Sequence, residues 1–232
     1  MASVKIDANE SSMDEVALLI TNSGIRVDCF VADVTDHWEL NDLANNLESD
    51  IGPVEALVTS LGIINNSQTI LEMDVEEYDR GWDVNYFGTI HTIWAFIQQM
   101  VAQNSRSIVT LCSITGMAAF PLPAYSPSKT AIMRLTQILA VEMGRFGVRL
   151  NGVAPTYVLS PTIQSRIDVG LRNPERIRKA GALEMFVLPE HIAEVINFLC
   201  SDAAAAITGT MIPVNAGWEA ATTYKSYAGG LP

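Results

Sequence analysis

The chain has 232 residues, of which 49% are hydrophobic and 17% are charged, and 14 Lys and Arg against 26 Asp and Glu give a formal net charge of −12. The hydrophobic fraction excludes a disordered chain, which needs low hydrophobicity and high charge density. The acidic balance argues against a nucleic-acid partner, because such a polyanion would be repelled. The length favours one compact domain over residues 1–232.

Targeting and redox features point to a soluble protein of the cytoplasm. No apolar stretch approaches the ~18 residues that span a bilayer, and the first residues lack the apolar segment of a signal peptide. Cys29, Cys112 and Cys200 lie far apart in apolar runs, without metal or disulfide spacing. We therefore expect reduced core cysteines, no metal and no membrane contact.

Short apolar runs alternate with segments of helical period along the chain. In chain order the pattern predicts a strand over 2–6, a helix over 13–22, a strand over 26–31, a helix over 36–47, a strand over 54–58, a long helical tract over 75–103, a strand over 107–111, a helix over 123–144, a strand over 149–154, a helix over 189–200 and a strand over 210–214. Strands separated by helices pair in parallel through right-handed crossovers. The predicted fold class is α/β with a doubly wound parallel sheet, and ligands bind such sheets at the carboxyl ends of the strands.

The strongest local signal combines a serine at a predicted strand end with a Tyr-x-x-x-Lys pair. Ser113 follows the strand over 107–111, and Tyr125 and Lys129 share one face of the following helix. A free tyrosine has a pKa of about 10, which a nearby ammonium lowers toward neutrality. The three groups suit proton transfer to an oxygen while a hydride moves to or from carbon. Taken alone, the pair is also typical of a surface lysine that extends past a partly buried tyrosine.

Further segments occur in a fixed order around this constellation. They are Asp-Val-Thr-Asp at 33–36, Val-Asn-Tyr-Phe-Gly at 84–88, Arg-Leu-Asn-Gly-Val-Ala-Pro at 149–155, and a closing stretch from Ser201 to Gly217. Together with Ser113, Tyr125 and Lys129, they resemble the classical short-chain dehydrogenase/reductase family over nearly the whole chain.

The resemblance implies an oxidoreductase that interconverts a secondary alcohol and a ketone with a nicotinamide cofactor. Tyr125 would be the general acid/base, Ser113 would position the reacting oxygen, Lys129 would bind the nicotinamide ribose and tune Tyr125, and Asn85 would hold a water in a proton relay. Two alternatives stay open. Asn85 is also typical of a helix-kink residue, and Ser113 of a strand-end hydroxyl bonded to its own backbone.

The cofactor-binding residues that the resemblance implies are Asp7, Asp33, Val34, Gly62, Tyr125, Lys129, Pro155, Thr156, Val158 and Ser160. Asp7 would bind the adenosine ribose at the end of the first strand. A carboxylate there favours NAD over NADP, because it repels the 2′-phosphate. The alternative is an ordinary loop aspartate that caps the next helix.

The sequence departs from the family at the phosphate site. The family's first strand and its glycine-rich turn, which bring backbone N–H groups to the pyrophosphate, have no counterpart, and the first glycine is Gly24. Leu61 and Thr156 replace smaller residues near the cofactor. The sheet would then rearrange, receive an edge from a partner, or belong to a shortened version of a longer protein. Two other functions remain open: a non-catalytic relative that binds no cofactor, and a lyase of the halohydrin dehalogenase kind, whose members carry arginine where this chain has Lys129.

The segment over 160–188 resembles a substrate lid. Expected pocket walls are Met117, Tyr157, Ile163, Leu183 and Met185, with Arg166 or Arg172 as solvated lid residues or as contacts for an anionic substrate. The resemblance implies that the helices over 75–103 and 123–144 form the subunit contact of a homo-dimer or homo-tetramer through an apolar face. The alternative is that this face simply packs against the sheet in the core. The residues of that face are Ile93, Trp94, Phe96 and Ile97. Tyr224 and Tyr227 in the tail would pack across a subunit boundary.

Overall fold

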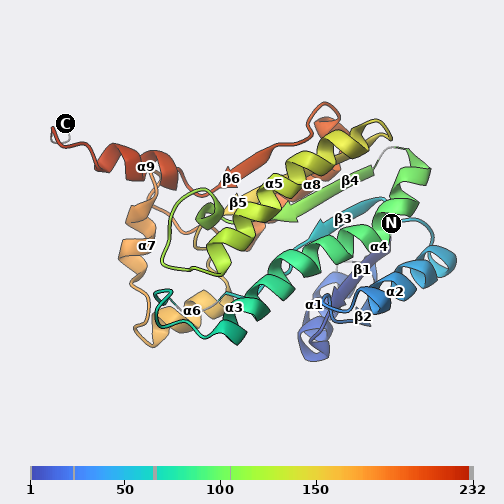
Figure 1. Ribbon diagram of the computed structural model, residues 1–232, viewed down its shortest axis with the longest axis horizontal. Helices are drawn as coiled ribbons and strands as arrows, with labels where there is room; N and C mark the ends of the chain where they lie inside the picture. The colour runs from blue at the N-terminus through green and yellow to red at the C-terminus, as the bar shows by residue number, and fades with distance from the viewer. Residues whose placement is uncertain (1, 23, 65–66, 105, 230–232) are drawn as a thin grey trace.

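A layered α/β fold is seen in the computed structural model, which describes residues 2–22, 24–64, 67–104 and 106–229 (Figure 1). Its strands are β1 (Ala2–Asp7), β2 (Arg26–Val31), β3 (Ala56–Thr59), β4 (Arg106–Leu111), β5 (Val148–Pro155) and β6 (Met211–Val214). Every strand pairing is parallel, and helices connect successive strands. The predicted fold class is confirmed.

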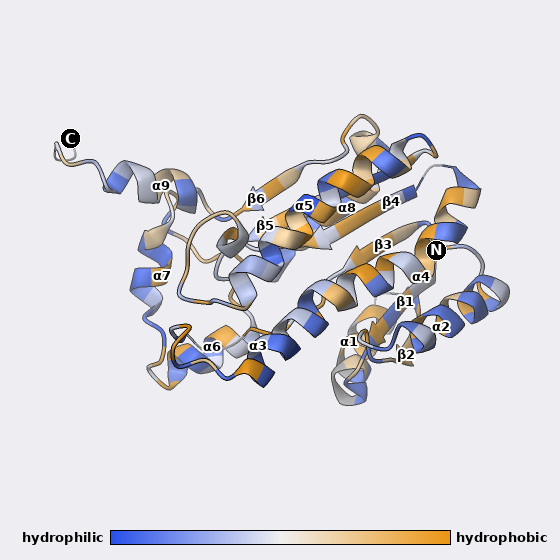
Figure 2. Cartoon of the chain, in the orientation of Figure 1, coloured by the Kyte–Doolittle hydropathy of each residue, from blue (hydrophilic) through white to orange (hydrophobic). Residues whose placement is uncertain are grey.

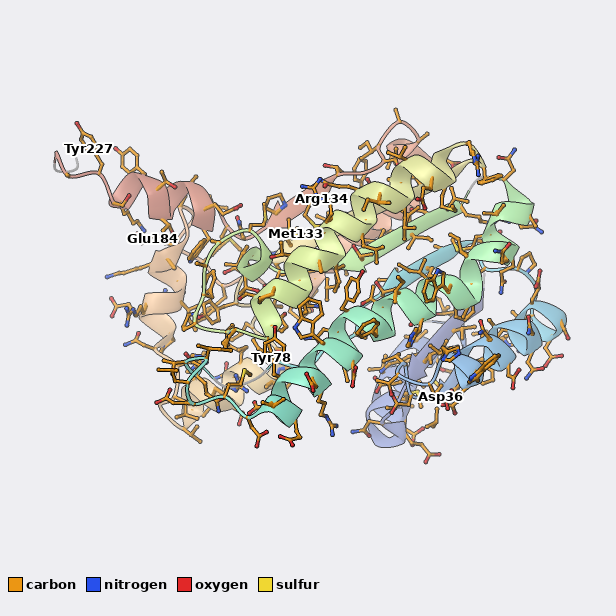
Figure 3. The ribbon with its side chains drawn as sticks, in the orientation of Figure 1. Asp36, Tyr78, Met133, Arg134, Glu184 and Tyr227 are labelled. Atoms are coloured by element: carbon orange, nitrogen blue, oxygen red, sulfur yellow. The ribbon has the colours of Figure 1, made fainter. Side chains whose placement is uncertain are left out.

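The predicted helices are present, with bounds that differ by a few residues. They are α1 (Glu10–Asn22), α2 (His37–Asp50), α5 (Tyr125–Gly144) and α8 (Pro189–Cys200), while the long tract divides into α3 (Val75–Trp82) and α4 (Gly88–Gln103) around a π-helical turn at Asp83–Phe87. Asp36 caps α2 by accepting hydrogen bonds from the amides of Trp38 and Glu39 (Figure 3). Within the described ranges, no helix combines the length and the apolar character needed to cross a membrane.

Three short helices were not predicted. They are α6 (Pro161–Asp168), α7 (Pro174–Ala180) and α9 (Trp218–Lys225). Helices of seven or eight residues span about two turns, which is too short for a hydrophobic period to stand out. The starts of α6 and α7 do carry a local signal, because Ser160 and Asn173 cap them and a proline follows each cap.

The strands form two sheets instead of one. β1 pairs only with β2, whereas β3, β4, β5 and β6 form a second sheet in that order. No strand pairing joins β1 to β3 among the residues that the structure describes. The sheet therefore does not close by rearrangement, and each sheet keeps a free edge toward the other.

One hydrophobic core nevertheless runs beneath both sheets. Ile6 of β1 and Phe30 of β2 pack against the same cluster as Leu57 of β3 and Ile108 of β4, and α2 and α4 contribute to it. Figure 2 shows hydrophobic positions along β3, β4 and the helix faces that cover them. A second cluster on the opposite face holds α8 against β4 and β5. The shared helical layer fixes the two sheets beside each other.

The expected apolar subunit face is largely used by this core. Ile93, Phe96 and Ile97 are buried in it, and only Trp94 points outward, with 60% of its surface exposed. The prediction of an interface through all four residues is wrong, because helical period directs three of them at the sheet. Tyr224 and Tyr227 are exposed on α9 and beyond it, and Tyr227 extends from the C-terminal end of the ribbon in Figure 3.

Candidate active site

The polar residues singled out from the sequence meet at the carboxyl end of β4 and the start of α5. Ser113 follows β4, and α5 begins at Tyr125, so that Tyr125 and Lys129 lie one helical turn apart. The Ser113 side chain acts on the Tyr125 phenol, whose pKa it lowers in part. The Lys129 ammonium nitrogen lies 5.5 Å from the centre of the Tyr125 ring. The fold therefore assembles the three side chains into one cluster.

Lys129 is a buried cation with backbone partners. Only 2% of it is exposed, and Nζ donates to the carbonyl oxygens of Leu111 at 3.0 Å and Leu61 at 3.4 Å. Burial lowers the pKa of Lys129 to about 8, a shift that Cys112 partly opposes. The alternative of a surface lysine is therefore wrong.

The pKa of Tyr125 is raised, not lowered as the sequence analysis predicts. Burial raises the pKa of Tyr125, and the Ser113 side chain opposes this only in part. Lys129 was expected to lower that pKa, but its ammonium donates to backbone carbonyls instead of to the phenol. The neighbouring Cys112 thiol is neutral at physiological pH, because burial raises its pKa to about 11. In this geometry Tyr125 is a protonated phenol.

The Ser113 hydroxyl is hydrogen-bonded to the backbone of the turn that follows it. It caps the short turn Ile114–Gly116 by accepting a hydrogen bond from the Thr115 amide at 3.2 Å, as the backbone-bonding alternative predicts. A hydroxyl has one proton to donate and two lone pairs. The cap therefore leaves it able to bond both the Tyr125 hydroxyl and one further oxygen.

Asn85 sits in the π-helical turn and ties it to the loop after β3. Its Oδ1 accepts from the Ile63 amide at 2.7 Å, and its Nδ2 donates to the Ile63 carbonyl at 3.0 Å. The Asn85 carbonyl accepts from the Thr89 hydroxyl at 2.7 Å. π turns are frequent at functional sites and leave backbone groups to be satisfied by side chains. Asn85 thus positions the loop that carries the Leu61 carbonyl bound by Lys129.

Gly62 is the point where this loop passes closest to the cluster. Its φ is +149°, and a Cβ at this position would lie 3.0 Å from Asn85 Oδ1 and 3.2 Å from Lys129 Nζ. We expect Gly62→Ala to lower activity at least tenfold, because the loop, Asn85 and Lys129 must move apart. Gly52→Ala is the matched control, since its φ is +116° and nothing lies within 4 Å of the added Cβ.

Both variants are measured by steady-state kinetics and thermal unfolding. Backbone strain of about 1–3 kcal/mol is common to the two, so their melting temperatures fall together. Equal activities of the two variants would contradict the crowding argument.

The expected cofactor residues lie at the carboxyl ends of the strands. Asp7 ends β1, Asp33 and Val34 follow β2, Gly62 follows β3, and Pro155 ends β5. Beyond β5, Val158 forms a bridge with Val187, and Ser160 caps α6. Thr156 lies in the chain between Pro155, at the end of β5, and Val158.

The Asp7 and Asp33 carboxylates differ in the hydrogen bonds that they accept from the protein itself. The Asp33 carboxylate accepts hydrogen bonds from the Thr35 amide and hydroxyl, and the backbone bond is the larger cause of its lowered pKa. Asp7 Oδ1 accepts from the Asn9 amide at 3.0 Å just before α1, which agrees with the capping alternative. Asp7 Oδ2 lies 3.9 Å from the Lys5 ammonium, and the Asp7 side chain is 39% exposed, so that it remains accessible at the end of β1.

A nicotinamide dinucleotide fits one part of this site better than the other. Lys129, Tyr125 and Ser113 offer buried polar groups to a nicotinamide riboside, and Thr59 Oγ1 at the end of β3 is buried without a hydrogen-bond partner among the described residues. The helices that follow Asp7 and Asp33 both begin with acidic groups: Glu10 opens α1, and α2 is capped by Asp36 with Glu39 in its first turn. Acidic groups at these helix starts oppose a phosphate. The described residues therefore suit the nicotinamide half and supply no glycine cradle for the pyrophosphate.

The expected substrate walls are only partly brought together. Ile163 lies on α6, whereas Leu183 and Met185 lie in the loop before α8, and Leu183 is 70% exposed. Met117 lines an open hollow of about 670 Å³ with Phe120 and Leu122, against the Ser126 and Thr130 side of α5. The structure does not unite these residues into one pocket.

Sequence reasoning missed the backbone partners of the cluster. They are the carbonyls of Leu61 and Leu111 and the peptide groups flanking Ile63. Backbone groups are present at every residue, so no residue type marks them in a sequence.

Comparison with known proteins places this geometry in a family context. Residues 2–219 match the family model described as enoyl-(acyl carrier protein) reductase. The chain is 31% identical to galactitol 2-dehydrogenase of Rhizobium johnstonii, over 94% of this chain and 85% of that protein. It is 30% identical to D-beta-hydroxybutyrate dehydrogenase of Rhizobium meliloti, over 89% and 83%. A solved structure titled ribose-5-phosphate isomerase from Brucella melitensis superposes with a TM-score of 0.89 at 31% identity, over 98% of this chain and 86% of that one.

Proposed function

Because the chain belongs to the classical short-chain dehydrogenase/reductase family, we propose that it interconverts a secondary alcohol and a ketone, with Tyr125 as general acid/base. The family makes it an NAD(P)-dependent oxidoreductase that acts on a small molecule. The observation that carries the finer proposal is the position of the Tyr125 ring, whose centre lies 5.5 Å from Nζ of the buried Lys129 at the end of the strand that Ser113 follows.

Each side chain of the cluster has a distinct part in the proposed reaction. The Ser113 hydroxyl hydrogen-bonds the reacting oxygen and holds it beside Tyr125. Tyr125 donates its proton to a carbonyl oxygen in reduction and accepts the proton of an alcohol in oxidation. The bound cofactor supplies or accepts the hydride. A protonated Tyr125 supports reduction at neutral pH, and oxidation should become faster as the pH rises toward the raised pKa of the phenol.

Asn85 and Lys129 are proposed to position the loop after β3, a relay water and the cofactor. Asn85 holds the loop after β3 through both of its amide atoms, and the proposal that it also holds a relay water rests on its place beside Ser128, whose hydroxyl lies 3.4 Å from Nδ2. Lys129 is proposed to bind the nicotinamide ribose, a hydroxylated group that can replace its backbone partners.

NAD is the proposed cofactor, with NADP as the weaker ligand. The support is the partly exposed Asp7 carboxylate at the end of β1, which repels a 2′-phosphate. We expect NADH to bind at least tenfold more tightly than NADPH. The measurement is a titration of the folded chain followed by nicotinamide fluorescence.

The matched variants for that titration are Asp7→Ser and Asp14→Ser. Asp7→Ser should reduce the NADH preference at least tenfold, while Asp14→Ser, an exposed change on α1, leaves it intact. A preference of the unmodified chain for NADPH would contradict the proposal. Binding of neither nucleotide would favour the non-catalytic alternative.

The remaining proposals concern assembly and context. A homo-dimer or homo-tetramer is supported by Trp94 on α4 and Val141 on α5, which are 60% and 81% exposed. A reducing compartment such as the cytoplasm is supported by the free state of Cys29, Cys112 and Cys200. We also propose that residues 1–232 form one domain with a lid over 160–188.

A further inference from the structure

The turn after β2 is held in place by a histidine of α4. His91 Nδ1 lies 3.2 Å from the Val34 carbonyl oxygen, which is 57 residues away in the chain. A carbonyl oxygen only accepts hydrogen bonds, so Nδ1 carries the proton in this contact. The Thr35 amide, which belongs to the same peptide group, donates to Asp33 Oδ1 at 2.9 Å. The Val34–Thr35 peptide group is therefore held at both of its ends.

α4 also contacts Val34 through its first residue. A Cβ on Gly88 would lie 2.6 Å from Val34 Cγ2, so the absence of a side chain allows the helix to approach the turn this closely. Gly88 and His91 are three residues apart and therefore lie on one face of the helix. This face contacts both the side chain and the main chain of Val34.

Aromatic rings restrict the orientation of the His91 side chain. α2 and α4 pack side by side (Figure 1), and the His91 ring centre lies 5.4 Å from that of His37 on α2. The ring centres of Phe87 and Trp94 each lie 6.3 Å from that of His91. His91 is partly buried among these rings, whereas His37 is exposed. The packing limits rotation of the imidazole, so that Nδ1 stays directed at Val34.

The turn at Val34 lies at the adenosine end of the proposed cofactor. The nicotinamide riboside is assigned to Lys129 after β4, and the adenosine ribose to Asp7 at the end of β1. β1 pairs with β2, and the Ala32 amide donates to the Asp7 carbonyl at 3.2 Å, so the turn after β2 begins beside Asp7. The Val34 amide has no hydrogen-bond partner among the residues that the structure describes, which leaves a main-chain donor open to a ligand.

We propose that His91 is a positioning residue for the cofactor, which fixes the Val34–Thr35 peptide group at the adenosine end of the site. This role rests on the proposed function, because it requires a dinucleotide that binds beside Asp7 and Val34. His91 is not part of the Ser113–Tyr125–Lys129 cluster and acts through the turn. Without the hydrogen bond the turn is less ordered, and a ligand that has to order it binds more weakly.

One helical tract would then position both ends of the site. Asn85, in the π turn directly before α4, holds the loop after β3 through both of its amide atoms. His91 lies six residues further along the same tract and holds the turn after β2. The two contacts connect the nicotinamide end and the adenosine end of the proposed site through one element.

The first test is hydrogen exchange of the Thr35 amide in the absence of nucleotide. His91→Leu removes the donor, and we expect exchange to become about three- to tenfold faster, the factor that corresponds to one hydrogen bond of ordinary strength. His91→Asn places its Nδ2 donor near the position of Nδ1 and should restore slow exchange. His37→Leu makes the same change on the neighbouring ring and should have no effect. The amide of Ile108 in β4 serves as the folding check.

The second test is the affinity for the cofactor. NADH is titrated by nicotinamide fluorescence, and ADP-ribose, which lacks the nicotinamide, is measured by its displacement of NADH. His91→Leu should weaken both ligands by about the same three- to tenfold factor, because the lost contact acts at the adenosine end. His91→Asn and His37→Leu should bind both ligands as the unmodified chain does.

The possible outcomes separate the role of His91 from the proposed function. Exchange or NADH affinity of His91→Leu within twofold of the unmodified chain would overturn the role of His91 and leave the function in place. Failure of His91→Asn to restore either property would overturn it as well, and so would a loss of NADH affinity without a loss for ADP-ribose. If the unmodified chain binds neither ligand, the proposed function is wrong, and the role of His91 is wrong with it.

Discussion

Tyr125→Phe is expected to lower kcat by about 10²- to 10⁴-fold, the range that removal of a general acid or base produces. The change keeps the ring and deletes only the hydroxyl that is proposed to transfer the proton. Because the ring packing is retained, the chain should fold normally. Steady-state kinetics of ketone reduction and alcohol oxidation, with circular dichroism as the folding check, measure the effect.

Tyr224→Phe is the control for the same chemical change. Its side chain is 58% exposed on α9, far from the cluster in sequence, and no effect on kcat is expected. In the unmodified chain, the oxidation rate should rise with pH, because the raised pKa of Tyr125 keeps the phenol protonated at neutral pH. Activity of Tyr125→Phe above one tenth of the unmodified chain would contradict the acid/base assignment.

Lys129→Met is expected to abolish activity and to raise the free energy of unfolding by about 1–3 kcal/mol at pH 7. The lysine is 2% exposed and its pKa is lowered to about 8. Burial of the protonated side chain therefore destabilises the folded state. Methionine has a similar length and no charge to desolvate. It leaves the carbonyls of Leu61 and Leu111 without their donor. The increase in the free energy of unfolding is therefore smaller than the free energy that corresponds to the lowered pKa of Lys129.

The pH dependence separates this effect from general packing. Below pH 8 the lysine is protonated in the folded and the unfolded chain, so the gain from methionine is complete. Above pH 8 the folded chain releases its proton first, and the unfolded chain retains its own up to about pH 10.4. The unmodified chain therefore becomes more stable relative to the variant across this interval, and the gain disappears.

Chemical denaturation at pH 7, 8, 9 and 10 measures this difference. Lys225→Met changes an exposed lysine of α9 and should give no gain at any of these pH values. A gain at Lys129 that is constant with pH would show that packing, and not the buried charge, is responsible.

The alternating pattern was sufficient to predict the strands and the long helices. Arg26–Val31 matches β2 residue for residue, because a short segment rich in Val, Cys and Phe between Gly24 and Asp33 has few other solutions. The π turn at Asp83–Phe87 was not predictable, since one extra residue per turn hardly alters the hydrophobic period of a long tract. The separation of β1 from β3 depends on contacts between distant strands, which no local pattern encodes.

The candidate cluster was predictable as a set of residues but not as an electrostatic arrangement. Spacing placed Tyr125 and Lys129 on one face, and the structure has them there. The direction of the Lys129 ammonium depends on two backbone carbonyls from different loops. The pKa of Tyr125 is raised mainly by burial, and burial depends on contacts between distant segments that no spacing of residues encodes.

The continuous core beneath an interrupted sheet also bears on how the molecule opens. β1, α1 and β2 are joined to the rest of the fold through α2, α4 and the shared cluster, without a ladder of hydrogen bonds to β3. A segment with this attachment can separate as one cooperative unit at a lower free energy than global unfolding. We therefore expect the residues from β1 to β2 to open before the sheet of β3 to β6, so that the region that carries Asp7 exchanges its amide protons faster than the Ser113–Tyr125–Lys129 cluster.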